Sequence, residues 1–188
     1  MNNKAHNKPQ KGFSLIEMLI VSAIFSIVIV AAFGVFTSAI KEQRYSLTYQ
    51  QMLDQSSYAI DYMSKLIRMT KRDNVGDCVA AGTNFNGNEP SPRTYIEFKD
   101  YNDKCRTFSL TLTDGGQQVW QNNDGTPSPL TSEKFKVTVL KFVVRGDGND
   151  GFQPKVTILL EIEGSGPAPQ PKIRIQTTVS QRDLDLFW

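Results

Sequence analysis

Oxygen-bearing side chains gather in a glycine-containing stretch at Asp147, Asn149 and Asp150. Carboxylate and amide oxygens are the ligands that Ca²⁺ prefers, so the stretch is a weak candidate for a Ca²⁺ site. The complete twelve-residue calcium loop ends in a glutamate, whereas the twelfth residue counted from Asp147 is Ile158, so that motif is absent. A solvated loop between two strands explains the same residues, and we expect no other cofactor.

Catalytic groups are scarce in this chain of 188 residues, which has a single histidine, His6. Because His6 lies near the N-terminus, the rest of the chain has no Ser-His-Asp or Cys-His site. Nothing in the spacing of its carboxylates selects the acid pair of a glycosidase; these include Glu89, Glu97, Asp100 and Asp103. We therefore expect that the protein is not an enzyme.

Charge is distributed unevenly along the chain, although 21 Lys and Arg against 19 Asp and Glu leave a net charge of only +2. Residues 1–12 contain Lys4, Lys8 and Lys11 without an acid, and residues 18–40 contain no charge. Such an uncharged run is long enough to span a bilayer, which takes about 20 apolar residues. The basic leader predicts a cytoplasmic N-terminus, with everything after Ile40 on the far side of the membrane.

Glu17 is the one acidic residue at the start of this apolar run. An acidic side chain in a membrane helix is unfavourable, and the residue one turn further on is Val21, so a partner must come from elsewhere. Three interpretations compete: an ordinary signal anchor, a secretory signal cleaved near residues 37–39, or a specific role for Glu17. The apolar region is longer than the core of a typical signal peptide, which disfavours cleavage there.

Residues 11–19, Lys-Gly-Phe-Ser-Leu-Ile-Glu-Met-Leu, resemble the prepilin signature of type IV pilins and type II secretion pseudopilins. The resemblance implies that a prepilin peptidase cuts between Gly12 and Phe13 and methylates the new N-terminus at Phe13. It also implies that Glu17 pairs with the N-terminal amine of a neighbouring subunit in a filament. Gly34 stands where major pilins often have a proline, so local melting of the helix is less clearly encoded.

Two cysteines, Cys78 and Cys105, follow the apolar run and would face an oxidising exterior. We expect a disulfide bond between them. Two free buried thiols are the alternative, because the sequence does not show whether the two Cα atoms approach within about 7 Å.

Helical periodicity continues beyond the apolar run as far as residue 72. Apolar and aromatic residues recur there at spacings of three, four and seven and predict a buried stripe: Tyr45, Tyr49, Met52, Leu53, Ile60, Met63, Leu66 and Ile67. Predicted strands then cover residues 94–99, 107–113, 117–121, 136–145, 155–163 and 172–180, with a hairpin turn at 114–116. Val156, Ile158, Leu160 and Ile162 alternate with more polar residues, which is typical of a sheet with one buried face.

These elements predict an α+β fold, in which a long N-terminal helix packs on an antiparallel sheet, as in pilins. The expected organisation is a removed leader (1–12), a transmembrane helix that forms the filament core (13–40), an amphipathic second half of the helix (41–72) and a β-rich globular domain (73–188).

Residues 52–69 and 175–182 resemble the corresponding parts of W-type minor pilins and J-type minor pseudopilins. The resemblance implies a minor subunit of a type IV pilus-like filament, with a secretion pseudopilin or a DNA-uptake or adhesion subunit as alternatives. The implied partners are prepilin peptidase, other pilin subunits, the inner-membrane assembly platform and the lipid bilayer. The implied location is a single-pass cytoplasmic membrane protein, with the β-rich domain outside, and then a periplasmic or extracellular filament.

Nucleic acid is the weaker partner. Lys71 and Arg72 are the only strong basic pair beyond the apolar run, and residues 41–188 are neutral overall.

Overall fold

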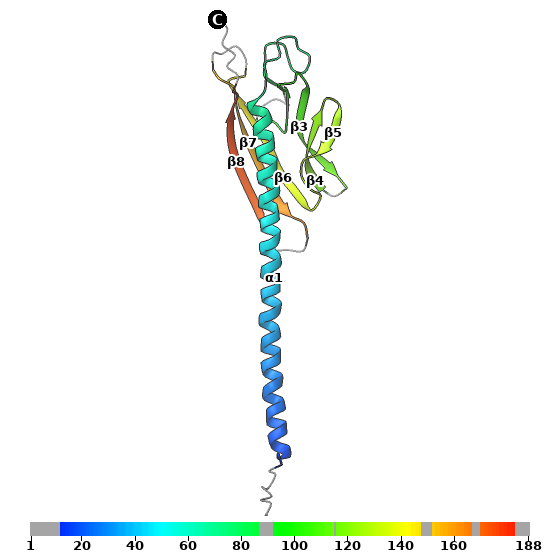
Figure 1. The fold of residues 1–188 in the computed structure, drawn as a ribbon, viewed down its shortest axis with the longest axis vertical. Helices are drawn as coiled ribbons and strands as arrows, with labels where there is room; N and C mark the ends of the chain where they lie inside the picture. Colours follow the sequence, from blue (N-terminus) through cyan, green and yellow to red (C-terminus); the bar gives the residue numbers. More distant parts are fainter. Residues whose placement is uncertain (1–11, 87–91, 115, 148–151, 167–169, 183–188) are drawn as a thin grey trace, which may run out of the picture. The chain divides into compact units, whose positions relative to one another are not determined.

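The computed structural model describes residues 12–86, 92–114, 116–147, 152–166 and 170–182. The chain divides into two compact units, residues 1–44 and residues 45–188, and the second is called the head here. One helix, α1 (Leu15–Arg68), begins in the first unit and ends in the head (Figure 1). The described residues of the head also contain eight strands, all paired antiparallel, so the α+β fold is confirmed.

Within the head, α1 buries one face. The buried residues recur every three or four positions, as a helix packed on one side requires: Met52, Ser56, Ala59, Ile60, Met63, Leu66 and Ile67. The prediction was wrong for Tyr45, Tyr49 and Leu53, which are 44%, 40% and 37% exposed. Gly164, the last residue of β7, lies beside Thr48, so β7 ends near this turn and leaves the preceding Tyr45 uncovered.

The helix ends at Arg68, four residues before the predicted end at residue 72. The backbone N–H of Lys71 donates to the carbonyl of Lys99 at 3.0 Å, and that of Asp73 donates to the carbonyl of Thr83 at 3.1 Å. Residues after the helix are therefore bonded to other parts of the head, and these bonds replace the next helical turn.

The first sheet is a five-stranded meander of β1 (Phe85–Asn86), β2 (Tyr95–Lys99), β3 (Cys105–Thr113), β4 (Gly116–Asn123) and β5 (Thr126–Pro129). The predicted hairpin joins β3 to β4, with Thr113 opposite Gly116. The sequence did not predict β1, which has two residues, or β5, which contains Pro127 and Pro129. Proline has no amide donor, which suits β5 to the edge of the sheet.

The second sheet contains β6 (Phe135–Arg145), β7 (Lys155–Gly164) and β8 (Lys172–Ser180) in that order. The single predicted sheet is therefore two. Reciprocal backbone hydrogen bonds of 2.8 Å between Arg93 and Phe142 form an isolated bridge from the chain before β2 to β6.

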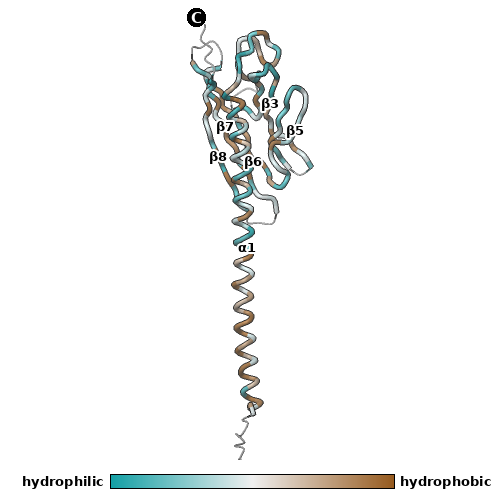
Figure 2. Tube along the Cα trace, viewed as in Figure 1, coloured by the Kyte–Doolittle hydropathy of each residue, from teal (hydrophilic) through white to brown (hydrophobic). Residues whose placement is uncertain are grey.

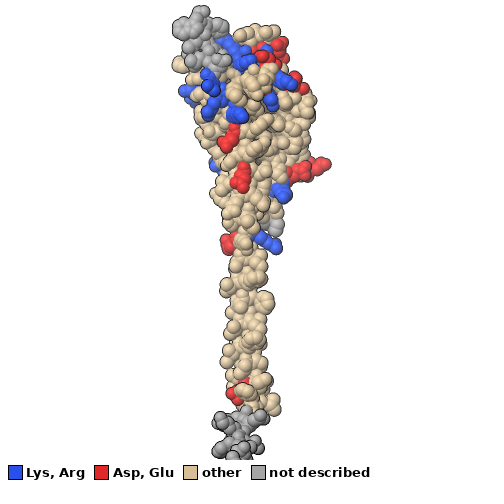
Figure 3. All heavy atoms as spheres, in the orientation of Figure 1, with Lys and Arg blue, Asp and Glu red and all other residues tan. Residues whose placement is uncertain are grey.

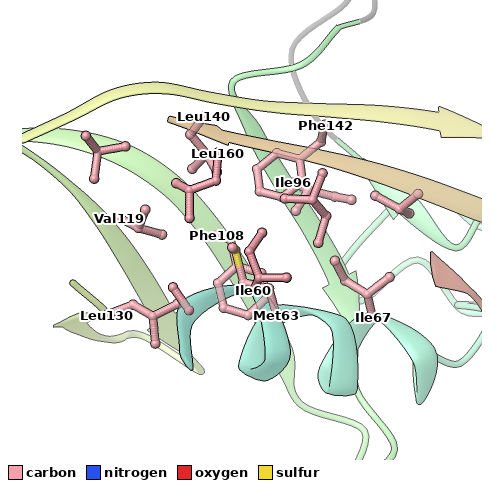
Figure 4. Packing of buried hydrophobic residues seen from close by; sticks show 14 of the residues in the cluster. Ile60, Met63, Ile67, Ile96, Phe108, Val119, Leu130, Leu140, Phe142 and Leu160 are labelled. Carbon is pink, nitrogen blue, oxygen red and sulfur yellow. The ribbon is translucent and has the colours of Figure 1, made fainter. Parts of the chain in front are cut away.

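One hydrophobic core lies between α1 and both sheets (Figure 4). Ile60, Met63 and Ile67 of the helix point toward strand residues such as Phe108 and Leu160. The predicted inward residues of β7 are all buried: Val156, Ile158, Leu160 and Ile162. Each fully buried side chain of this size stabilises the fold by about 1.5–3 kcal/mol, so the core is the main source of the head's stability.

Glu161 is buried in the middle of β7, between inward-facing Leu160 and Ile162. Its carboxylate accepts hydrogen bonds of 2.7 Å from Arg174 Nε and Thr138 Oγ1 and lies 2.7 Å from Lys172 Nζ. The contacts from Lys172, Thr138 and Arg174 outweigh the effect of burial and lower the pKa of Glu161 to about 2. Thr138 lies at an irregularity in the pairing of β6 with β7, and Lys172 and Arg174 belong to β8. The Glu161 carboxylate of β7 therefore links both neighbouring strands.

We expect Glu161 to make the head less stable in acid. A pKa lowered from 4.5 to about 2 on folding adds stability that is complete above about pH 4.5 and is lost as the pH falls toward 2. The difference in unfolding free energy between wild type and Glu161→Gln should therefore shrink by about 3 kcal/mol between pH 6 and pH 2. Urea denaturation of the full chain in detergent micelles measures this difference. The partly exposed Glu163→Gln should stay within about 0.5 kcal/mol of wild type, and a pH-independent Glu161→Gln difference would contradict the account.

Candidate assembly site

The predicted processing residues lie where α1 begins. Gly12, Phe13 and Ser14 precede the helix, and the N–H of Met18 donates to the carbonyl of Ser14 at 3.2 Å. Glu17 lies in the first turn. Unpaired backbone N–H groups give this end of a helix a partial positive charge, so a carboxylate is favourable there.

The segment that follows is apolar and uncovered (Figure 2). Every residue from 12 to 39 is exposed, including Phe13 at 78% and Leu15 at 85%. By length and composition, α1 contains one stretch that could cross a membrane, and none of that stretch is buried within the described chain. An apolar surface of this kind needs lipid or another protein to cover it, which is consistent with membrane anchoring of a pilin before assembly.

The hydroxyl groups of this segment are already bonded. Ser22, Ser26, Thr37 and Ser38 each donate to a backbone carbonyl three or four residues earlier, at 2.8–3.1 Å. The carbonyl of Gly34 accepts two of these bonds, and Gly34 itself is helical. Since an unpaired polar group is costly in hydrocarbon, these bonds suit the segment to apolar surroundings.

Neither Glu17 nor Gly12 is required by a contact within the described part of the chain. Within the described part of the chain, Glu17 is exposed and has no ion-pair partner. A Cβ atom added at Gly12 would meet nothing within 4 Å, so packing of the described residues does not require glycine there. The packing of the described residues therefore gives no reason for either residue to be present.

The expected disulfide is confirmed between Cys78 and Cys105, whose Cα atoms are 5.2 Å apart. The bond joins the loop after α1 to the first residue of β3. Sequence reasoning identified this pair but missed the carboxylates that shape the chain on each side of it.

Asp73 organises the loop of residues 73–83. Its buried carboxylate accepts four backbone hydrogen bonds of 2.7–3.2 Å, from the N–H groups of Val75, Gly76, Cys78 and Val79. Burial alone would raise the pKa of Asp73, but these four bonds hold it well below its usual range. The signal in the sequence is an Asp followed three residues later by Gly76, which has a positive φ of 89°.

Asp100 shapes the neighbouring loop in the same way. Its buried carboxylate accepts from the N–H groups of Asn102 and Lys104 at 2.8 and 3.0 Å, and from Nε of Arg106 at 2.9 Å. Burial opposes ionisation, yet these bonds lower the pKa of Asp100 overall. Both loops linked by the disulfide are thus fixed by an ionised buried aspartate.

Asp147 is the one described residue of the predicted Ca²⁺ stretch, since Asn149 and Asp150 lie outside the described residues. Its Oδ1 atom accepts from the backbone N–H groups of Asn84 and Phe85 at 2.8 and 3.2 Å, and its Oδ2 atom lies 4.0 Å from Arg93. Asp147 therefore holds strand β1 in place, and the Ca²⁺ site stays a prediction.

The helix and the two antiparallel sheets define a pilin-like fold. Residues 7–33 match the family model described as the prokaryotic N-terminal methylation motif. The chain therefore combines a pilin-like fold with an N-terminal methylation motif, and proteins of the pilin family are generally non-enzymatic structural subunits. No curated protein and no solved structure matches the chain.

We expect Asp73→Asn to destabilise the head by about 3 kcal/mol or more. An amide has one acceptor oxygen, so at least two of the four N–H groups would lose their partner, at about 1–3 kcal/mol each. Asp77→Asn is the matched control on the same loop, because the Asp77 side chain is 61% exposed and makes one ion pair, at 3.3 Å with Lys99, so a change under about 1 kcal/mol is expected. Denaturation of both oxidised variants measures the effect, and equal stabilities would refute the role of Asp73.

Proposed function

We propose that the protein is a minor structural subunit of a type IV pilus-like filament. It enters the cytoplasmic membrane with residues 1–12 inside and the head outside, is cut between Gly12 and Phe13, and is methylated at Phe13. The observation that carries this proposal is the exposed apolar part of α1, in whose first turn Glu17 has no ion-pair partner among the described residues. The methylation motif over the same residues supports it.

Glu17 would set the position of each subunit. Cleavage after Gly12 places a new amine at Phe13, two residues before α1, where the positive end of the helix disfavours a cation. The carboxylate of Glu17 in a neighbouring subunit neutralises that amine, and each charge removes the cost of burying the other. Apolar packing of residues 13–40 between subunits then forms the filament core.

The minor role is supported by the resemblance of residues 52–69 and 175–182 to W-type minor pilins and J-type minor pseudopilins. Prepilin peptidase, other pilin subunits, an inner-membrane assembly platform and the bilayer are the partners that this route requires. The same helix would serve a secretion pseudopilus, which is the alternative role.

Replacement of Glu17 tests the pairing. In cells that carry the assembly machinery, Glu17→Ala should insert into the membrane normally but be lost from filaments by about tenfold or more, as expected for an uncompensated buried amine. Glu42→Ala removes an exposed carboxylate beyond the apolar segment and should assemble as wild type. Quantitative immunoblotting of membrane and filament fractions gives both values, and unchanged incorporation of Glu17→Ala would refute the pairing.

Replacement of Gly12 tests the processing site separately. The structure has open space at this position, so Gly12→Val should leave the head and the helix unchanged. We expect Gly12→Val to stay uncut when prepilin peptidase is present, because the proposed cleavage requires glycine at this position. No contact of the described chain requires it. Efficient cleavage of Gly12→Val between residues 12 and 13 would contradict this assignment.

A further inference from the structure

Two neighbouring surface cavities of the head lie where α1 and β8 end. They share Arg68, Met69 and Arg182. The first has a volume of about 320 Å³ and is also lined by Lys71 and Tyr101. The second has a volume of about 280 Å³, and its other lining residues are Asp61, Ser64 and Lys65. Four of the residues around the two cavities are therefore basic.

Hydrogen bonds join the chain after β8 to the end of α1 at this site. The N–H of Arg182 donates to the carbonyl of Arg68 at 2.8 Å, and Nε2 of Gln181 donates to the carbonyl of Thr70 at 2.8 Å. These bonds satisfy carbonyls at the end of α1, so the guanidinium groups are not needed to cap the helix. Two arginines that are 114 positions apart in the sequence thus meet at one site on a rigid support.

Among the described residues, the positive charge at this site is only partly compensated. Lys65, Arg68 and Arg182 are exposed and make no ion pair with any described residue, whereas Lys71 pairs with Asp103 at 3.3 Å at the surface. The one lining carboxylate is Asp61. Lys and Arg side chains also gather at this end of the head in the space-filling view (Figure 3). The surface therefore complements a ligand with several negative charges.

An aromatic ring lies beside the cations. Tyr101 lines the first cavity and is 49% exposed, and its loop is fixed by the hydrogen bonds of Asp100. Arginine binds phosphate through two parallel hydrogen bonds, and an exposed aromatic ring offers a surface on which a nucleobase stacks. The combination of phosphate donors and a stacking ring distinguishes this site from one built for a simple anion.

We propose that the two cavities bind a single nucleic-acid strand, with successive phosphates at Arg68 and Arg182 and a base against Tyr101. The site lies wholly in the head, so this binding is a property beyond the filament role and does not depend on it. Two phosphate contacts to a single strand predict a slope of about −1.4 for the logarithm of the affinity against that of the salt concentration.

The test uses the full chain in detergent micelles and a labelled single-stranded DNA oligonucleotide, with binding followed by fluorescence anisotropy. The double variant Arg68→Ala, Arg182→Ala should bind at least tenfold more weakly, since each phosphate contact to a charged donor is strong. Its matched control is Lys134→Ala, Lys141→Ala, which removes two exposed cations elsewhere in the head and should change affinity less than twofold. Unchanged near-ultraviolet circular dichroism verifies the fold of both.

A second pair of variants tests the ring. Tyr101→Ala should weaken oligonucleotide binding about fivefold or more and leave competition by inorganic polyphosphate unchanged, while the exposed Tyr45→Ala should have no effect. No salt-dependent binding by the full chain, or equal losses in the arginine variant and the lysine control, would overturn the proposal. Retention on anionic vesicles without oligonucleotide binding would also overturn it and would assign the cations to a membrane surface.

Discussion

The rest of the structure depends on one constraint: an apolar helical segment carries a single carboxylate in its first turn and is exposed along its length. No part of the described chain covers residues 13–39, and water is an unfavourable environment for so many apolar side chains. The segment therefore needs hydrocarbon or other helices around it. In both surroundings Glu17 is costly unless a cation meets it. Under the proposed function, membrane anchoring and filament assembly are two solutions to the same physical problem, and processing after Gly12 would supply the cation that Glu17 needs.

The head solves a different problem, which is to keep exposed loops in one conformation without a large core of their own. A buried carboxylate does this in two loops, where Asp73 and Asp100 bind the N–H groups of their own loops, and the partly buried Asp147 binds those of strand β1 in the same way. The disulfide from Cys78 to Cys105 then joins the ordered loop after α1 to the start of β3. In this way the surface near the end of α1 is held rigid enough to present Tyr101 and its neighbouring cations.

Much of this architecture follows from the sequence, because periodicity and spacing are local properties. The apolar segment, the inward residues of β7 and the hairpin between β3 and β4 are encoded by neighbouring residues, and so is the motif around Gly12 and Phe13. Long-range contacts are not encoded locally. Nothing in the sequence places Arg182 against Arg68, and Tyr45 is exposed because β7 ends beside Thr48, on the next turn of the helix.

The central claim is that this helix is processed as a pilin and then meets its neighbours through its new N-terminus. The most direct test is the intact mass and N-terminal sequence of the full-length protein recovered from membranes of cells that carry a prepilin peptidase. The account predicts a chain that begins at Phe13 and is heavier by one methyl group. An uncut chain beginning at Met1 in the presence of active peptidase would contradict it, as would a chain that begins near Ile40 and lacks Glu17.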